Sequence, residues 1–219
     1  MLFNSFEFLV FLPIVFLLYW FAFKKLRAQN LFVVVASYLF YGWWDWRFLI
    51  LIAFTTLCSY ASGILLERQE GHRHIQRLIS IANIVLNLTI LGIFKYFNFF
   101  SENLQHLFQW FGFELDWVTL DILLPVGISF YTFQALSYTI DIYRHKMKPT
   151  HDIVAFFAFI SFFPQLVAGP IERATNLLPQ FERQRAFDYT AAVDGMRQIL
   201  WGLFKKIVVA DKCQGVFYF

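Results

Sequence analysis

The residues of this 219-residue chain that could take part in chemistry stand out because their surroundings are apolar. Gln134, Ser137 and Asp141 recur at steps of three and four, so a helix places them on one face. We interpret Gln134 either as lining a polar cavity or as bonding to a neighbouring helix. An ionisable group in or near lipid needs a partner or water, and Arg144 or His145 could pair with Asp141. Asp141 is therefore either a substrate contact or one half of a salt bridge that ends the helix.

A second candidate is the run FFPQLVAGPI, residues 162–171, where prolines, a glycine and a glutamine interrupt an apolar stretch. Pro164 and Pro170 each remove a backbone donor, and Gly169 favours a turn. Broken backbone at membrane depth is tolerated only where protein or a wet cavity surrounds it. We therefore expect this run, with Gln165, to mark a place where a membrane protein handles a substrate.

Familiar catalytic arrangements do not emerge from the spacing of the remaining residues. There is no CxxC motif and no glycine-rich phosphate loop, and the two cysteines, Cys58 and Cys213, have apolar neighbours typical of buried side chains. The pair His72 and His74 lacks metal-ligand spacing and fits a solvated basic loop. The five histidines all lie in predicted loops or at helix ends: His72, His74, His106, His145 and His151. We expect neither a bound metal nor a bound cofactor.

Composition predicts an integral membrane protein. Hydrophobic residues make up 59% of the chain and charged residues 15%, whereas globular domains average roughly half and about a quarter. The net charge of +3 is too small and too scattered to suggest nucleic acid as a partner. The sequence predicts an all-α, polytopic transmembrane protein made of one domain, 1–219, with no separate soluble domain. Five apolar segments approach the length of a span: 8–23, 31–44, 48–66, 78–100 and 122–143.

The basic residues between these segments alternate in number, which predicts the topology. The loops near residues 27, 72 and 147 carry three lysines or arginines each, whereas residues 98–121 carry none. By the positive-inside rule the three basic loops are cytoplasmic and the N-terminus is outside. An acidic segment then lies outside, and it contains Glu102, Glu114, Asp116 and Asp121.

This alternation fails once, at residues 154–168. A full crossing there would place four arginines outside, namely Arg173, Arg183, Arg185 and Arg197. A re-entrant segment that enters from the cytoplasm, breaks at Pro164 and Gly169, and returns satisfies both the charge count and the backbone argument. A full crossing remains the alternative, because long loops are weaker signals of topology.

The sequence after Asp188 predicts an amphipathic helix. Asp188 can cap it, and apolar residues from Tyr189 to Ile207 recur at steps of three and four. This helix could lie at the cytoplasmic interface with Lys205 and Lys206 reaching headgroups, or it could pack against a polar cavity.

Three motifs in order carry a resemblance to a known family: PVGISFYTFQALSYTIDIYR, FFPQLVAGPIERATNLLPQF and GLFKKIVVAD. Together they resemble the membrane-bound O-acyltransferase family, in particular its bacterial alginate O-acetyltransferase branch. The resemblance runs through essentially the whole chain. It implies a many-helix fold around a tunnel, in the bacterial inner membrane. It also implies transfer of an acyl group from a cytoplasmic donor, acetyl-coenzyme A or an acyl-carrier thioester, to hydroxyls of an extracytoplasmic polysaccharide such as alginate.

The resemblance also bears on individual residues. The family's general base is a histidine that follows a tryptophan, and none of the five histidines matches it. We therefore expect the chain to be an N-terminal fragment, inactive alone, with the catalytic histidine downstream. The resemblance implies that the run around Gln165 helps to form the donor-side funnel, with Glu172 and Arg173 at its mouth. It places Lys205 and Lys206 in a basic motif that could attract an anionic donor or an acidic partner surface.

Two other classes of protein stay open at this point. A transporter or channel would also use a re-entrant segment beside a polar stripe, although the chain shows no paired halves. A structural subunit of a polysaccharide synthase or export complex is the other alternative. Accessory acetyltransferase or export proteins are expected partners, besides the lipid bilayer.

Overall fold

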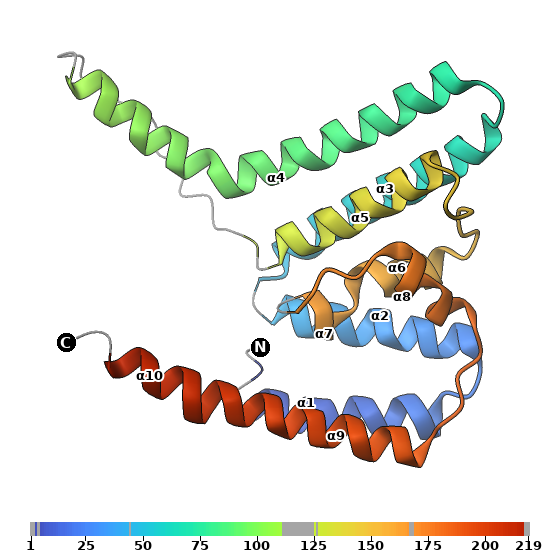
Figure 1. Cartoon of the computed structure of the whole chain (residues 1–219), viewed down its shortest axis with the longest axis vertical. Helices are drawn as coiled ribbons and strands as arrows, with labels where there is room; N and C mark the ends of the chain where they lie inside the picture. Colours follow the sequence, from blue (N-terminus) through green and yellow to red (C-terminus); the bar gives the residue numbers. More distant parts are fainter. Residues whose placement is uncertain are drawn as a thin grey trace. The chain divides into compact units, whose positions relative to one another are not determined.

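The computed structural model describes residues 3, 5–43, 45–110, 125, 127–166 and 169–216, and within these residues the chain is helical with no strand (Figure 1). The predicted acidic residues Glu114, Asp116 and Asp121 lie outside the described residues. The elements in chain order are α1 (Phe6–Leu17), the wider π-helical turn η1 (Leu18–Ala22), α2 (Leu26–Gly42), α3 (Arg47–Arg68), α4 (Arg73–Trp110), α5 (Ile128–Tyr143), α6 (Ile153–Ser161), α7 (Phe163–Leu166), α8 (Ala174–Glu182), α9 (Tyr189–Phe204), η2 (Lys205–Ala210) and α10 (Asp211–Val216).

Each predicted apolar segment corresponds to a helix. Two helical stretches, Arg47–Arg68 and Arg73–Ser101, are long and apolar enough to cross a membrane, and Phe6–Ala22 and Ile153–Leu166 are shorter apolar stretches. The first residues of the segment 122–143 lie outside the described part of the chain. The all-α prediction is therefore confirmed for the described residues, whereas the number of membrane crossings stays a prediction.

The chain forms two compact units, one made of residues 1–29 with 184–219 and the other of residues 30–183. In the first unit the chain before α9 packs on α1 and η1. The Phe187 ring lies 5.4 Å from that of Trp20, and the Arg185 guanidinium lies 5.4 Å over the Tyr19 ring. Asp188 caps α9 as the sequence predicts, because its carboxylate accepts hydrogen bonds from the N–H groups of Thr190 and Ala191.

In the second unit α5 packs against both α3 and α4, and α6 packs against α3 and α8. The centre is aromatic: the fully buried rings of Tyr138 and Phe156 lie 4.5 Å apart. Gly63 on α3 makes this packing possible, since a Cβ there would lie 2.6 Å from the Tyr138 hydroxyl. A small residue at this crossing lets two helices approach closely.

Helix α2 is joined to the later segments by contacts over a long sequence distance. The Ser37 hydroxyl accepts a hydrogen bond of 3.2 Å from the N–H of Phe163, and the Asn30 amide donates one of 2.8 Å to the Phe181 carbonyl. The Phe40 and Phe163 rings lie 5.3 Å apart. Helix α2 thus contacts the segment from Phe163 to Phe181 at both of its ends.

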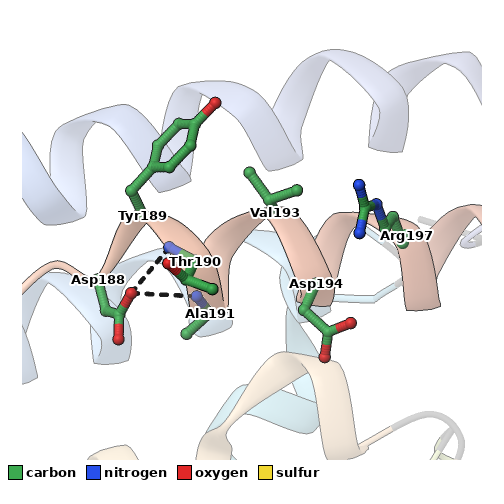
Figure 2. Close-up of a pocket in the computed structure, with 7 residues that line it drawn as sticks. All are labelled: Asp188, Tyr189, Thr190, Ala191, Val193, Asp194 and Arg197. Atoms are coloured by element: carbon green, nitrogen blue, oxygen red, sulfur yellow. Dashed lines mark hydrogen bonds between the residues drawn. The ribbon is translucent and has the colours of Figure 1, made fainter.

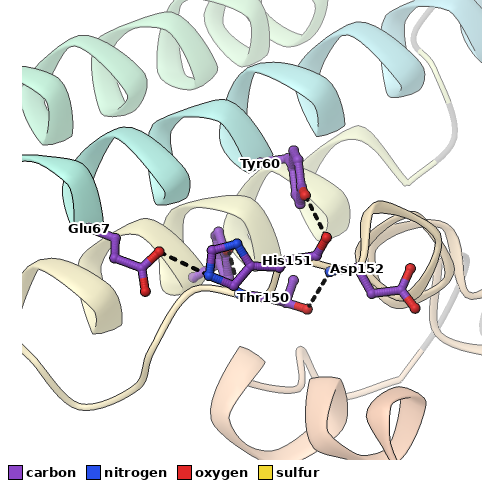
Figure 3. Close-up of polar contacts among 6 residues, drawn as sticks. Tyr60, Glu67, Thr150, His151 and Asp152 are labelled. Carbon is purple, nitrogen blue, oxygen red and sulfur yellow. Dashed lines mark hydrogen bonds and ion pairs between the residues drawn. The ribbon is translucent and has the colours of Figure 1, made fainter.

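The loop between α5 and α6 is pinned to α3 (Figure 3). The Tyr60 hydroxyl donates to the His151 carbonyl at 2.9 Å, and the His151 imidazole lies 3.0 Å from the Glu67 carboxylate. The Thr150 N–H also donates to the Tyr138 hydroxyl at 3.3 Å. These contacts place the basic loop near residue 147 at the same end of the unit as the loop near residue 72.

Candidate functional site

Around the broken run 162–171, of which residues 167 and 168 lie outside the described part, α6, α7 and α8 form a helical hairpin rather than one straight helix. Helix α6 ends at Ser161, the backbone of its C-cap Phe162 (φ −54°, ψ 104°) leaves the helical region, and the four-residue α7 follows. Gly169 has φ 125°, a conformation that side chains rarely allow. The chain then reverses, so that α8 lies against α6 (Figure 1). The predicted break in the helix is therefore confirmed.

A hollow opens at this reversal, and it gathers most of the site residues that the sequence predicts in this run. The Gln165 side chain spans the turn by donating a hydrogen bond of 3.1 Å to the Pro170 carbonyl. The wall contains one carboxylate and two primary amides among apolar groups. The lining residues are Phe162, Pro164, Gln165, Gly169, Pro170, Glu172, Leu177 and Gln180. Arg173 precedes α8 as its N-cap, is exposed, and is not among the lining residues.

Ser137 connects the polar stripe of α5 to this hairpin. Its hydroxyl donates to the Gln134 carbonyl at 2.9 Å and accepts a hydrogen bond of 3.4 Å from the Ala174 N–H. Because α8 has no cap from its own N-cap side chain, Ser137 serves as a cap from another helix. The stripe therefore lies beside the start of α8, a contact that helical spacing within α5 alone could not predict.

The other two residues of the stripe are buried: Gln134 is 2% exposed and Asp141 is 6% exposed. Among the described residues neither side chain makes a hydrogen bond or ion pair, and the predicted pairing of Asp141 with Arg144 or His145 is wrong. The reason is how α5 ends. His145 adopts φ 55°, and the N–H groups of His145 and Lys146 bond back to Ile142 and Asp141 carbonyls at 2.8 Å. This Schellman turn ends the helix with backbone bonds alone.

Two of the three motifs that carry the family resemblance meet in space at Gly127. This residue is the N-cap of α5 with φ 76°, and a Cβ on it would lie 2.3 Å from the Leu166 carbonyl oxygen at the end of α7. Only glycine allows both this backbone conformation and this approach. The motif that starts at residue 125 and the motif that starts at residue 162 thus form one structural feature.

Lys205 and Lys206 belong to the other unit and have separate local contacts. Lys205 lies 5.2 Å over the Trp201 ring, and Lys206 pairs with Asp211 at 2.6 Å. Within the described residues, none from α9 to α10 is buried. The two lysines are therefore available at a surface, but Lys206 is already partly neutralised.

A shallow hollow at the start of α9 offers less chemistry. Figure 2 shows that its lining comes from one helix start, with the Asp188 carboxylate bonded to the Thr190 and Ala191 N–H groups. Asp194 and Arg197 form no ion pair with each other. The cap occupies the helix N-terminus, so this hollow is a feature of helix capping.

Sequence reasoning missed a buried polar network between α3, α4 and α5. Asn83 donates to the Thr139 hydroxyl at 2.7 Å, and Asn87 donates to the Asn83 side-chain oxygen at 3.2 Å. Ser62 lies 3.4 Å from Thr139, and Ser59 donates to Asn83 at 3.4 Å. We call Ser59, Ser62, Asn83, Asn87 and Thr139 the polar network. Its signal was present in the sequence, because Gln76, Ser80, Asn83 and Asn87 recur at steps of four and three in an apolar helix.

No described histidine lines the hollow beside Gln165. His72, His74 and His145 are exposed, His151 pairs with Glu67, and the side chain of His106 lies outside the described part. Within the residues that the structure describes, no group of three potential metal ligands occurs. The expectation that none of these histidines is a tunnel base stays a prediction.

Comparison with known proteins identifies relatives over nearly the whole chain. The probable alginate O-acetylase AlgI of Pseudomonas aeruginosa is 38% identical over 212 residues, which cover 96% of this chain and 40% of that protein. The protein of the same name from Azotobacter vinelandii is 38% identical over 213 residues, covering 96% and 42%. The peptidoglycan O-acetyltransferase of Helicobacter pylori is 31% identical over 243 residues, covering 96% and 45%. No protein-family model and no solved structure matches the chain.

The described residues define a helical protein with two helices long and apolar enough to cross a membrane and a hollow at a broken hairpin. The relatives make the class specific. Over 96% of its length the chain is similar to proteins of the O-acetyltransferase branch of the membrane-bound O-acyltransferase family. It spans about two fifths of the length of the relatives it matches.

Proposed function

We propose that this chain is part of a membrane O-acetyltransferase whose donor side includes the hollow between α6 and α8. The observation that carries this proposal is the meeting of two family motifs at Gly127 and Leu166, directly beside that hollow. In the proposed reaction an acceptor hydroxyl attacks the acetyl carbonyl, the thiolate leaves, and a base takes the hydroxyl proton. We propose a histidine as that base.

The arrangement of the helices supports a re-entrant course for the hairpin. Helix α6 has nine residues, about 14 Å of rise, and Ile153–Leu166 about 21 Å, against roughly 30 Å for a hydrocarbon core. Both ends of the hairpin lie at the end of the unit where α3 and α5 also finish, since His151 pairs with Glu67 and Phe181 bonds to Asn30. We place this end, with its basic loops, in the cytoplasm of a bacterial inner-membrane protein.

The lining of the hollow fits part of a thioester donor. Gln165 and Gln180 each offer an amide donor and acceptor, and Phe162, Pro164 and Leu177 supply apolar walls. Acetyl-coenzyme A or an acyl-carrier thioester is the donor that we propose. For the acceptor we propose a polysaccharide hydroxyl, as the names of the relatives suggest for alginate and peptidoglycan. An accessory acetyltransferase or an export protein is the proposed partner.

The experiment measures the acetyl content of cell-surface polysaccharide in the native host with the gene intact, deleted, and restored. Deletion should abolish the acetyl groups and restoration should return them. Restoration with Gln165→Ala should return them only in part, because both the turn and one wall of the hollow lose the amide. Gln109→Ala, an exposed position on α4, is the matched control and should restore fully. Unchanged acetylation after deletion would refute the activity.

A further inference from the structure

Two buried tyrosine hydroxyls lie beside the broken segment without a hydrogen-bond partner. Tyr41 on α2 is 7% exposed and Tyr131 on α5 is 0% exposed. Among the described residues neither hydroxyl donates or accepts a hydrogen bond. Burial of an unpaired hydroxyl is costly, and native proteins satisfy almost all such groups with protein atoms or with ordered water.

The Tyr41 hydroxyl lies at the contact between Gly127 and Leu166, close to the hydroxyl of Tyr131. The Tyr41 hydroxyl lies 3.1 Å, and the Leu166 carbonyl oxygen 2.3 Å, from the position that a Cβ of Gly127 would take. Tyr131 follows one turn after Gly127, to whose carbonyl its N–H donates at 3.2 Å. The hydroxyl of Tyr41 is also near enough to act electrostatically on that of Tyr131. Three elements, α2, α5 and α7, thus direct polar groups to one place.

The same place contains the uncapped start of a long helix. Helix α5 has 16 residues, Ile128–Tyr143, and its N-cap, Gly127, offers no side chain to accept from the first N–H groups. The Ile128 and Phe130 N–H groups donate to the Pro125 and Gly127 carbonyls, which leaves the Ser129 N–H in need of an acceptor. The two hydroxyls can both donate and accept. All of these groups are neutral, so the ligand that matches them is small, uncharged, and able both to donate and to accept.

We propose that the junction of Tyr41, Tyr131 and Gly127 binds ordered water. A buried water makes about three hydrogen bonds, and two hydroxyls and a helix start supply that number. Water at this point joins α7 to α2 and α5 without rigid direct bonds. When the broken segment moves slightly, the water can reorient and keep these polar groups hydrogen-bonded. The proposal concerns hydration alone, so it stands or fails separately from the proposed transferase activity.

The chain contains a matched control in Tyr138. It is also 0% exposed and on α5, but its hydroxyl accepts from the Thr150 N–H and its ring packs on Phe156. Tyr138 therefore has no need of water. A comparison of Tyr41 and Tyr131 with Tyr138 separates bound water from burial, because all three are buried tyrosines.

The test is X-ray hydroxyl-radical labelling of the intact protein in nanodiscs, read by mass spectrometry. Radicals formed from bound water label buried residues next to it. We expect Tyr41 and Tyr131 to be labelled several-fold faster than Tyr138. Labelling at the rate of Tyr138 would overturn the proposal.

A second measurement tests the proposal in case Tyr41 and Tyr131 are labelled by radicals that do not come from the bound water. In Tyr131→Phe, the loss of one hydroxyl should weaken the water site and slow labelling at Tyr41. In Tyr138→Phe, labelling at Tyr41 should not change. Circular dichroism and gel filtration check that each variant is folded. Equal labelling of Tyr41 in all three proteins would show that the hydroxyl pair does not hold the water.

Discussion

The polar network and the junction of Tyr41, Tyr131 and Gly127, which we call the tyrosine junction, are both buried and polar. Only the network pairs its polar side chains with one another. In the network, five side chains from α3, α4 and α5 bond to one another at 2.7–3.4 Å. The Asn87 side-chain oxygen is its one unpaired atom. At the junction, Tyr41 and Tyr131 have no partner among the described residues. The first arrangement holds helices together, whereas the second leaves capacity for a ligand.

This difference indicates which part of the unit is fixed and which part can adjust. Buried polar groups that pair within the protein specify one arrangement of helices. The hairpin of α6, α7 and α8 contains the broken backbone and the hollow, and the unpaired hydroxyls of Tyr41 on α2 and Tyr131 on α5 lie beside it. We therefore assign a scaffold role to α3, α4 and the C-terminal part of α5, and a binding role to the hairpin and the start of α5.

Replacement of Gly127 should have the largest effect, because it forces the start of α5 and the end of α7 apart where they meet. Gly127→Ala places a Cβ 2.3 Å from the Leu166 oxygen and strains a backbone with φ 76°. We expect a loss of at least about 2 kcal/mol in the free energy of unfolding. Chemical unfolding in detergent measures this loss. Gly92→Ala, with nothing within 4 Å, should instead be neutral or stabilising, and equal effects would contradict the argument.

Replacement of Asn83 should break the network itself. Asn83→Ala removes the bonds to Thr139, Ser59 and Asn87. We expect a loss of about 1–2 kcal/mol, in the range of polar contacts between membrane helices. A double-mutant cycle with Thr139→Val should give a coupling of about 0.6–1.7 kcal/mol. A coupling near zero would show that the 2.7 Å bond does not hold α4 to α5.

The contact of Gly63 with Tyr138 tests how tightly the scaffold is packed. In Gly63→Ala the added methyl would meet the Tyr138 ring at 2.6–3.0 Å. Overpacking costs about 1–3 kcal/mol, and the better helix propensity of alanine returns up to about 1 kcal/mol. We expect a net loss of about 1 kcal/mol by thermal unfolding. A rise in Tm equal to that of Gly92→Ala would mean that Tyr138 is free to move.

The ion pair of Glu67 and His151 should have the smallest effect. The His151 side chain is largely exposed and Glu67 is partly exposed. Exposed pairs contribute little, so Glu67→Gln should cost at most about 0.5 kcal/mol, less in high salt. Unfolding at low and at high salt measures this. A loss well above 1 kcal/mol would show that the loop between α5 and α6 is a main support of the scaffold.

The sequence predicted the helices and their ends more accurately than it predicted the contacts between side chains. Apolar segments predicted the helices, Asp188 predicted a cap, and the prolines of the run 162–171 predicted the break, because each depends on neighbours in sequence. The pairing of Asp141 was wrong, since spacing cannot foresee that His145 adopts φ 55° and ends the helix with backbone bonds.

Other features of the site depend on residues far apart in the sequence. Ser137 was predicted as part of a stripe, but its bond to Ala174 arises only when α5 and α8 meet. The same holds for the approach of Gly127 to Leu166. The polar network was within reach of pattern analysis, because its α4 residues follow helical spacing in an apolar stretch.

The bonds of α2 to the hairpin set an order of events during synthesis. Ser37 is 126 residues from Phe163, and Asn30 is 151 residues from Phe181. At about 5–20 residues per second, a ribosome needs roughly 6–25 s to supply the partner of Ser37. During that interval α2 presents unpaired polar groups, while α3 and α4 can already join. The hairpin is thus the last part of its unit to be synthesised, and its docking supplies the hydrogen-bond partners of Ser37 and Asn30 on α2.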